Sequence, residues 1–134
     1  MKTVVASGYF DPIHKGHIRY LEESKKLGNV LIVIVNNDTQ AILKKGKPFY
    51  PDQEERMEII KALKCVDDVV LSLDEDKSVC KTLEWLKPDI FTNGGDRTSK
   101  NIPEIGICEK YGIRTIFGVG GNKVNSSSEL IKTL

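Results

Sequence analysis

The sequence predicts a single α/β domain, residues 1–134, in which helices wind over both faces of a five-stranded parallel sheet. Short apolar runs of strand length alternate with segments of helical periodicity, which is the pattern of repeated strand-helix-strand units. A length of 134 residues also fits one domain that buries about two-thirds of its unfolded surface. The predicted strands are Thr3 to Ser7, Val30 to Val35, Asp68 to Ser72, Ile90 to Thr92 and Arg114 to Val119.

Four helices are expected between and after these strands. The first covers Gly16 to Leu27 and stops at Gly28, a residue that commonly ends helices. The second begins at Asp52, an N-cap residue with Glu55 three positions later. We place the four helices at Gly16 to Leu27, Asp52 to Lys64, Lys77 to Leu86, and from Ser126 to the end.

The two longest irregular segments are Leu43 to Pro51 and Asn93 to Pro103. Loops of this length in a small α/β domain are commonly functional. Ligands of such domains bind outside the carboxyl ends of the parallel strands, where the strand order reverses. Both loops are therefore expected near the carboxyl end of the first strand.

Composition and charge narrow the class of partner. Twenty basic residues against 19 acidic ones leave a net charge of +1, so no overall field favours nucleic acid or an anionic membrane. The longest apolar run, Val30 to Val35, is too short to span a bilayer, and the first residues lack a signal-peptide pattern. Three widely spaced cysteines fit reduced thiols. We expect a soluble cytoplasmic protein.

The most informative segment follows the first strand and runs from Gly8 to His17. A strand that leads through a glycine turn into a helix directs the helix's unpaired N–H groups and its positive dipole end at one point, which favours an anion. Both histidines of the chain, His14 and His17, lie three positions apart there and share one helical face. Gly16 between them lets a ligand approach the backbone. We predict that a nucleotide phosphate binds at this turn.

The histidines have two other interpretations. A single histidine is usually an ordinary surface or core residue, but both histidines of this chain fall at the one strand-to-helix turn. A metal site built from Asp11, His14 and His17 has suitable ligand types, yet no further residues complete a clear zinc set. The sequence therefore assigns no metal ligands, and a metal-binding protein that uses these three residues stays the minor alternative.

The pattern Gly8, Phe10, Asp11, His14, Gly16 and His17 resembles the signature of the cytidylyltransferase-like nucleotidyltransferases, the HxGH family, which have a Rossmann-like fold. Order and spacing look most like the adenylyltransferase domain of the bifunctional heptose enzyme, and nearly as much like glycerol-3-phosphate cytidylyltransferase. The resemblance implies transfer of a nucleotide from an NTP to a phosphorylated acceptor, with release of pyrophosphate. It also suggests a homodimer, since members of the family commonly pair.

The resemblance assigns roles to individual residues. Catalysis would fall to His14, His17, Lys45 and Arg56, with the two imidazoles donating hydrogen bonds to phosphate oxygens and Arg56 making a bidentate phosphate contact. The alternative for Arg56 is an ion pair with Asp52 on its own helix. The expected nucleotide-binding residues are Gly8, Tyr9, Phe10, Asp11, Gly16, Lys47, Gly94, Gly95, Asp96, Ser126, Ser127 and Ser128. Mg²⁺ would enter with the NTP.

One departure from the family pattern concerns the donor nucleotide. The cytidylyltransferases carry an Arg-Thr-x-Gly stretch before the serine run, and here Val119 to Lys123 stands in its place. ATP is therefore expected, with CTP the close second. A small sugar or polyol phosphate is the expected acceptor. The alternatives are glycerol-3-phosphate or another alcohol phosphate with CTP, and a catalytically idle nucleotide-binding module.

Overall fold

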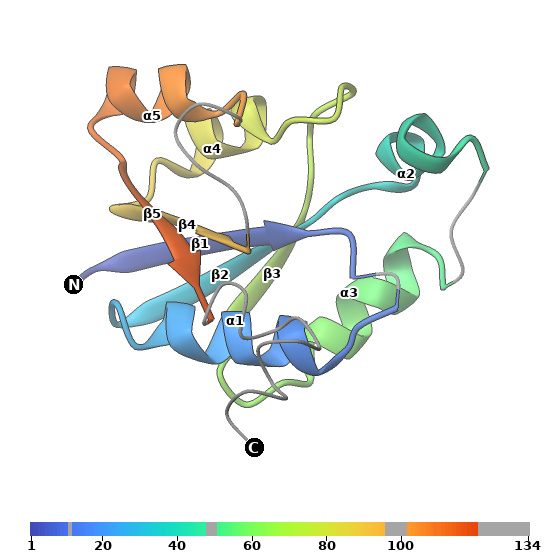
Figure 1. Cartoon of the computed structure of the whole chain (residues 1–134), viewed down its shortest axis with the longest axis horizontal. Helices are drawn as coiled ribbons and strands as arrows, with labels where there is room; N and C mark the ends of the chain where they lie inside the picture. The colour runs from blue at the N-terminus through green and yellow to red at the C-terminus, as the bar shows by residue number, and fades with distance from the viewer. Residues whose placement is uncertain (11, 48–50, 96–101, 121–134) are drawn as a thin grey trace.

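Five strands form one all-parallel sheet in the order β3-β2-β1-β4-β5. The computed structural model describes residues 1–10, 12–47, 51–95 and 102–120 (Figure 1). From β1 the chain adds β2 and β3 on one side of the sheet and then β4 and β5 on the other. The topological switch point therefore lies between β1 and β4. The predicted α/β class and all five strands are confirmed. They are β1 (Thr3–Gly8), β2 (Val30–Val35), β3 (Asp68–Leu71), β4 (Ile90–Gly94) and β5 (Arg114–Val119).

Helices cover both faces of the sheet (Figure 1). One face carries α1 and α3, and the other carries α4 and α5. The described helices are α1 (Lys15–Lys25), α2 (Asp38–Lys45), α3 (Gln53–Lys61), α4 (Cys80–Leu86) and α5 (Ile105–Tyr111). None of these helices is long and apolar enough to cross a membrane.

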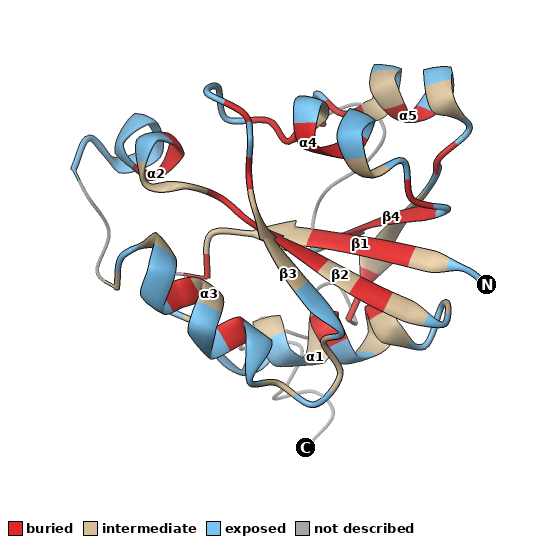
Figure 2. Cartoon of the chain, turned by 180° about the vertical axis from the view of Figure 1, so that it is seen from behind, coloured by how far each residue is buried: buried red, intermediate tan, exposed pale blue. Residues whose placement is uncertain are grey.

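The core consists of two apolar clusters separated by the sheet. Val4 of β1 packs with Leu21 of α1 on one face, while its neighbour Val5 packs with Leu83 of α4 on the other. Successive side chains of a strand point to opposite faces, so a strand covered on both sides needs an unbroken apolar run. Figure 2 shows this as nearly continuous burial along the middle of β1 and β2.

Two helices were missed in the sequence. Helix α2 occupies part of the segment expected to be irregular, and α5 lies between the fourth and fifth strands without a predicted counterpart. Helix α2 is only eight residues long and leaves Ile42 and Leu43 exposed, so it has no clear apolar stripe. Its stability comes from a capping box in which Asn37 and Gln40 bond each other's backbone N–H groups.

Helix ends also differ from the prediction. The predicted helix from Lys77 begins at Cys80, because residues 74–79 form a hydrogen-bonded turn on the Asp74 and Asp76 carboxylates. The predicted N-cap at Asp52 is confirmed, since its carboxylate accepts from the Glu55 N–H at 3.0 Å. The expected last helix from Ser126 lies outside the described residues.

Candidate active site

The turn after β1 is shaped by an unusual backbone conformation at Phe10. Phe10 has a φ of +54° and a side chain that is 3% exposed. Its ring lies over Gly8, where an added Cβ would come within 2.8 Å of the ring's Cζ. Strained backbone of this kind persists only where the surroundings hold it, and it is common at functional sites. Because Gly8 has no side chain, the Phe10 ring can lie over it while the chain turns from β1 toward α1.

His14 and His17 cap the helix that follows. The His14 Nδ1 accepts from the Gly16 N–H at 3.1 Å, and the His17 Nδ1 accepts from the His14 N–H at 3.1 Å. The two rings stack with centroids 3.8 Å apart and planes 28° apart. A neutral imidazole that accepts at Nδ1 carries its proton on Nε2. The arrangement therefore gives two adjacent Nε2–H donors, as the shared helical face predicts.

His17 is held in its neutral form. Burial lowers the pKa of His17 to about 4, and the neighbouring charges of His14 and Lys44 act in the same direction. The edge of the Phe10 ring packs against it with centroids 5.2 Å apart. At neutral pH His17 is a hydrogen-bond donor without a charge.

The carboxyl end of α2 brings lysines to this turn. The Lys44 Nζ lies 4.2 Å from the centre of the Tyr9 ring, a cation-π contact. The predicted phosphate ligands Lys45 and Lys47 are exposed near the same helix end. The sequence groups Lys44 with Lys45 and Lys47 as one basic cluster, but its contact with Tyr9 was not foreseen, because α2 was not predicted.

Arg56 has a different position from the one predicted. Its side chain is 1% exposed, and its guanidinium donates to the backbone oxygens of Tyr9, Asn36 and Pro51 at 2.8 to 3.1 Å. It also forms an ion pair with the Asp38 carboxylate at 2.9 Å, not the expected pair with Asp52. These donors are directed to protein oxygens, so Arg56 positions the turn, and its bidentate phosphate contact stays a prediction.

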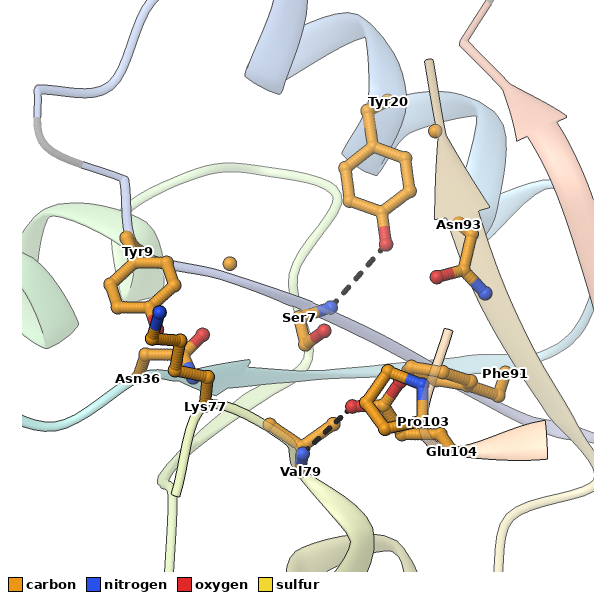
Figure 3. Close-up of a pocket in the computed structure, with 12 residues that line it drawn as sticks. Ser7, Tyr9, Tyr20, Asn36, Lys77, Val79, Phe91, Asn93, Pro103 and Glu104 are labelled. Carbon is orange, nitrogen blue, oxygen red and sulfur yellow. Dashed lines mark hydrogen bonds between the residues drawn. The ribbon is translucent and has the colours of Figure 1, made fainter. Parts of the chain in front are cut away.

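A hollow of about 170 Å³ opens beside this turn, over the carboxyl ends of β1, β2 and β4 (Figure 3). This is where the strand order predicts a ligand. Of the residues expected there, Gly8, Tyr9 and Gly94 line it. Gly95 follows with a φ of +59°. The expected site residues Asp11, Asp96, Ser126, Ser127 and Ser128 lie outside the described residues.

Several lining residues were not predicted. Lys77, Val79 and Glu104 come from the β3–α4 turn and from the residue before α5, and only a known strand order brings them together. The turn is fixed by Gln40 of α2, whose amide donates to the backbone oxygens of Asp76 and Ser78. Asn36, Tyr20 and Asn93 also line the hollow.

The site combines a helix N-terminus that carries two imidazole donors, basic side chains nearby and a hollow at the switch point. These features are typical of α/β domains that bind phosphate groups. The chain belongs to the cytidylyltransferase-like family, whose model matches residues 5–131. The resemblance seen in the sequence is thereby confirmed, and the family consists of nucleotidyltransferases.

The similar proteins have one of two names, FAD synthase or bifunctional protein HldE. The chain is 39% identical to the FAD synthase of Thermoplasma acidophilum over 140 residues, covering all of this chain and 94% of that protein. It is 46% identical to the FAD synthase of Ferroglobus placidus over 97 residues, or 72% of this chain and 61% of that one. It is 38% identical to the bifunctional protein HldE of Geobacter metallireducens over 84% of this chain. That match spans only 23% of HldE.

A solved structure shows the same fold. The lipopolysaccharide core biosynthesis protein from Thermoplasma volcanium superposes with a TM-score of 0.73 at 37% identity. The match covers 87% of this chain and 95% of that one. The similarity to HldE agrees with the heptose-type resemblance, whereas the FAD synthases were not foreseen from the sequence.

Proposed function

We propose that the protein transfers AMP from ATP to a small phosphorylated acceptor and releases pyrophosphate. The observation that carries the proposal is the stacked pair His14 and His17, with two Nε2–H donors at the amino end of α1. The similarity to an FAD synthase over the whole chain supports ATP as the donor, because FAD is AMP joined to FMN. CTP is the second donor to test.

The proposed reaction needs no side-chain nucleophile. An oxygen of the acceptor phosphate attacks the α-phosphorus of ATP and forms a new P–O bond. The bond from the α-phosphorus to the bridging oxygen breaks, and pyrophosphate leaves with that electron pair. Charge spreads over the equatorial oxygens and the leaving group, so catalysis depends on position and electrostatics. In this proposal the Nε2–H groups of His14 and His17 donate to those oxygens.

The basic side chains near α2 support the same reaction. Lys44 lies beside Tyr9, and Lys45 and Lys47 are exposed close by. We assign them to the leaving pyrophosphate, whose charge grows as the bond breaks. Arg56 acts through the protein, since it holds the backbone of Tyr9 and Asn36 in place.

Mg²⁺ would reach the site on the triphosphate. Among the described residues, no three histidine, cysteine, aspartate or glutamate side chains gather closely enough to hold an ion. In this proposal the magnesium ion takes phosphate oxygens and water as its main ligands. The ion would neutralise triphosphate charge.

The acceptor is proposed to be FMN, with a sugar phosphate as the second candidate. FMN carries its phosphate on a ribityl chain and is therefore a polyol phosphate, the class expected from the sequence. The FAD synthase relative matches nearly from end to end, whereas HldE matches over a fraction of its own length. The first observation supports FMN as the first acceptor to test.

A pyrophosphate-release screen tests the proposal. ATP, CTP, GTP and UTP are each combined with FMN, a heptose 1-phosphate and glycerol 3-phosphate in the presence of Mg²⁺. We expect release with ATP and FMN, and formation of FAD in equal amount. The His17→Asn protein serves as the inactive control. Nucleotide binding without pyrophosphate release from any pair would contradict the proposal and favour an idle binding module.

A further inference from the structure

Lys77 brings a positive charge to the hollow at the switch point. Of the described residues that line the hollow, it alone has a cationic side chain. It belongs to the turn between β3 and α4, whereas Lys44, Lys45 and Lys47 at the end of α2 do not line the hollow. The proposed reaction brings two anionic molecules together, and the α2 lysines are assigned to the triphosphate. The phosphate of the other molecule, the acceptor, needs a cation of its own.

The backbone on both sides of Lys77 is held in place. The amide of the buried Gln40 donates to the backbone oxygens of Asp76 and Ser78 at 2.6 and 2.8 Å. The Asp76 carboxylate in turn accepts from the Ser78 N–H at 2.9 Å and from the Ser78 hydroxyl at 2.6 Å. These bonds fix the point from which the Lys77 side chain extends. A binding residue on a fixed backbone loses less conformational freedom when a ligand binds.

The Lys77 ammonium is accessible to a ligand. Lys77 is exposed, and its side chain forms no hydrogen bond or ion pair within the part of the chain that the structure describes. Figure 3 shows this side chain extending from its turn toward the side of the hollow where Tyr9 and Asn36 lie. A phosphate in the hollow can therefore bind the Lys77 Nζ without displacing a protein partner among the described residues.

The two charged side chains of the described lining lie on different sides of the hollow. Lys77 is on the side of Tyr9, whereas the Glu104 carboxylate lies next to Val79 and accepts from its N–H at 2.9 Å (Figure 3). An anionic group is attracted by Lys77 and repelled by Glu104, so a phosphate is favoured on the Tyr9 side. Tyr9 belongs to the turn that leads to His14, which is the side of the proposed reaction centre.

We propose that Lys77 binds the phosphate of the acceptor and directs it toward the reaction centre. Its Nζ donates to a phosphate oxygen and offsets part of the repulsion between the acceptor phosphate and the triphosphate. The inference rests on the proposed function, because it takes the hollow as the binding site of the acceptor. FMN and a sugar phosphate both carry such a group, so the shared chemistry is a phosphate monoester.

The test compares Lys77→Met and Lys77→Arg with the unchanged protein. Met keeps an unbranched side chain without the charge, whereas Arg keeps the charge. We expect Lys77→Met to raise the KM for the acceptor about tenfold or more and Lys77→Arg to raise it less, with the KM for ATP within about twofold. FMN and heptose 1-phosphate are run as separate arms, and the arm in which the unchanged protein releases pyrophosphate identifies the acceptor.

Two controls show whether the effect comes from the phosphate. Riboflavin is FMN without its phosphate, and the free heptose is the matching compound for the sugar arm. Their inhibition constants should stay within about twofold in Lys77→Met, because they lack the group that Lys77 binds. Lys81→Met removes the same charge from an exposed position of α4 outside the hollow, and it should leave both KM values unchanged. Both variants should keep their melting temperature, since both lysines are exposed.

Failure of this inference and failure of the proposed function give different results. If the unchanged protein releases pyrophosphate and Lys77→Met keeps its acceptor KM, the inference is wrong and the function stands. A rise in the KM for ATP alone would also overturn it, since Lys77 would then contact the triphosphate. An equal loss of riboflavin binding, or an equal effect of Lys81→Met, would do the same. If the unchanged protein releases no pyrophosphate with any acceptor, the function fails and the inference fails with it.

Discussion

The His14 backbone N–H donates to the His17 Nδ1, while the His14 Nδ1 accepts from the N–H of Gly16, the second residue of the same helix. Each imidazole thus uses one nitrogen to build the helix cap and keeps the other nitrogen for donation. The same hydrogen bonds therefore cap the helix and orient the two donors. This explains how two histidines three residues apart stack with centroids only 3.8 Å apart.

Asparagine at position 14 or 17 separates capping from catalysis. Its Oδ1 takes the place of Nδ1 and keeps the cap, since asparagine is a strong N-cap residue, but no donor remains at the position of Nε2. We expect His14→Asn and His17→Asn to fold normally and to lose at least ~10²-fold in turnover. His17→Ala should lose as much. Pyrophosphate release and circular dichroism check this, and near-normal turnover would refute the role of the imidazoles.

Replacing Arg56 with Met should destabilise the fold. The substitution leaves the Asp38 carboxylate and the backbone oxygens of Tyr9, Asn36 and Pro51 without their donor. We expect the free energy of unfolding to fall by about 3–5 kcal/mol, measured by urea denaturation. Asp38→Asn should cost much less, because that side chain is 36% exposed. An unchanged stability combined with a raised KM for ATP would restore the phosphate role read from the sequence.

The low pKa of His17 gives the fold a pH dependence. The pKa is about 4 in the folded protein and 6.5 for an unperturbed histidine, so unfolding takes up a proton between these values. The stabilising contribution is complete above pH 6.5 and is lost as the pH falls toward 4. Urea unfolding at several pH values should show the unchanged protein losing stability relative to His17→Asn across this window. A difference in unfolding free energy between the two proteins that does not change with pH would contradict the low pKa of His17.

Gly120 fixes the end of β5 against α1. It has a φ of +89°, and an added Cβ would lie 2.8 Å from the Tyr20 Cα and 3.0 Å from its backbone nitrogen. Backbone atoms cannot move aside as a flexible side chain does, so Gly120→Ala should cost about 1–3 kcal/mol. Gly106→Ala is the control, since open space surrounds that α5 position and alanine favours helix. Equal stability of the two variants would contradict this packing.

The strands and the histidine pair were predictable because their signals are local. Unbroken apolar runs such as Val30–Val35 identify buried parallel strands, and the spacing of His14 and His17 fixes a shared face. Helix α2 was not predictable from periodicity, since its capping box stabilises it while its apolar residues stay exposed.

The contacts that were not foreseen join residues far apart in the sequence. Arg56 reaches the backbone of Tyr9, 47 positions away, so no local pattern distinguishes a buried clamp from a phosphate ligand. Lys77 and Glu104 line one hollow only because the strand order brings their turns together. The Asn93 side chain carries no sequence signal beyond its place at the end of a strand.

A crystal structure with Mg²⁺ and a non-hydrolysable ATP analogue tests directly whether the two imidazoles bind the triphosphate. We expect the Nε2 atoms of His14 and His17 to lie within about 3.2 Å of oxygens on the α-phosphate or the group bridging it to the β-phosphate. A polyphosphate bound away from the amino end of α1, with neither imidazole in contact, would contradict it.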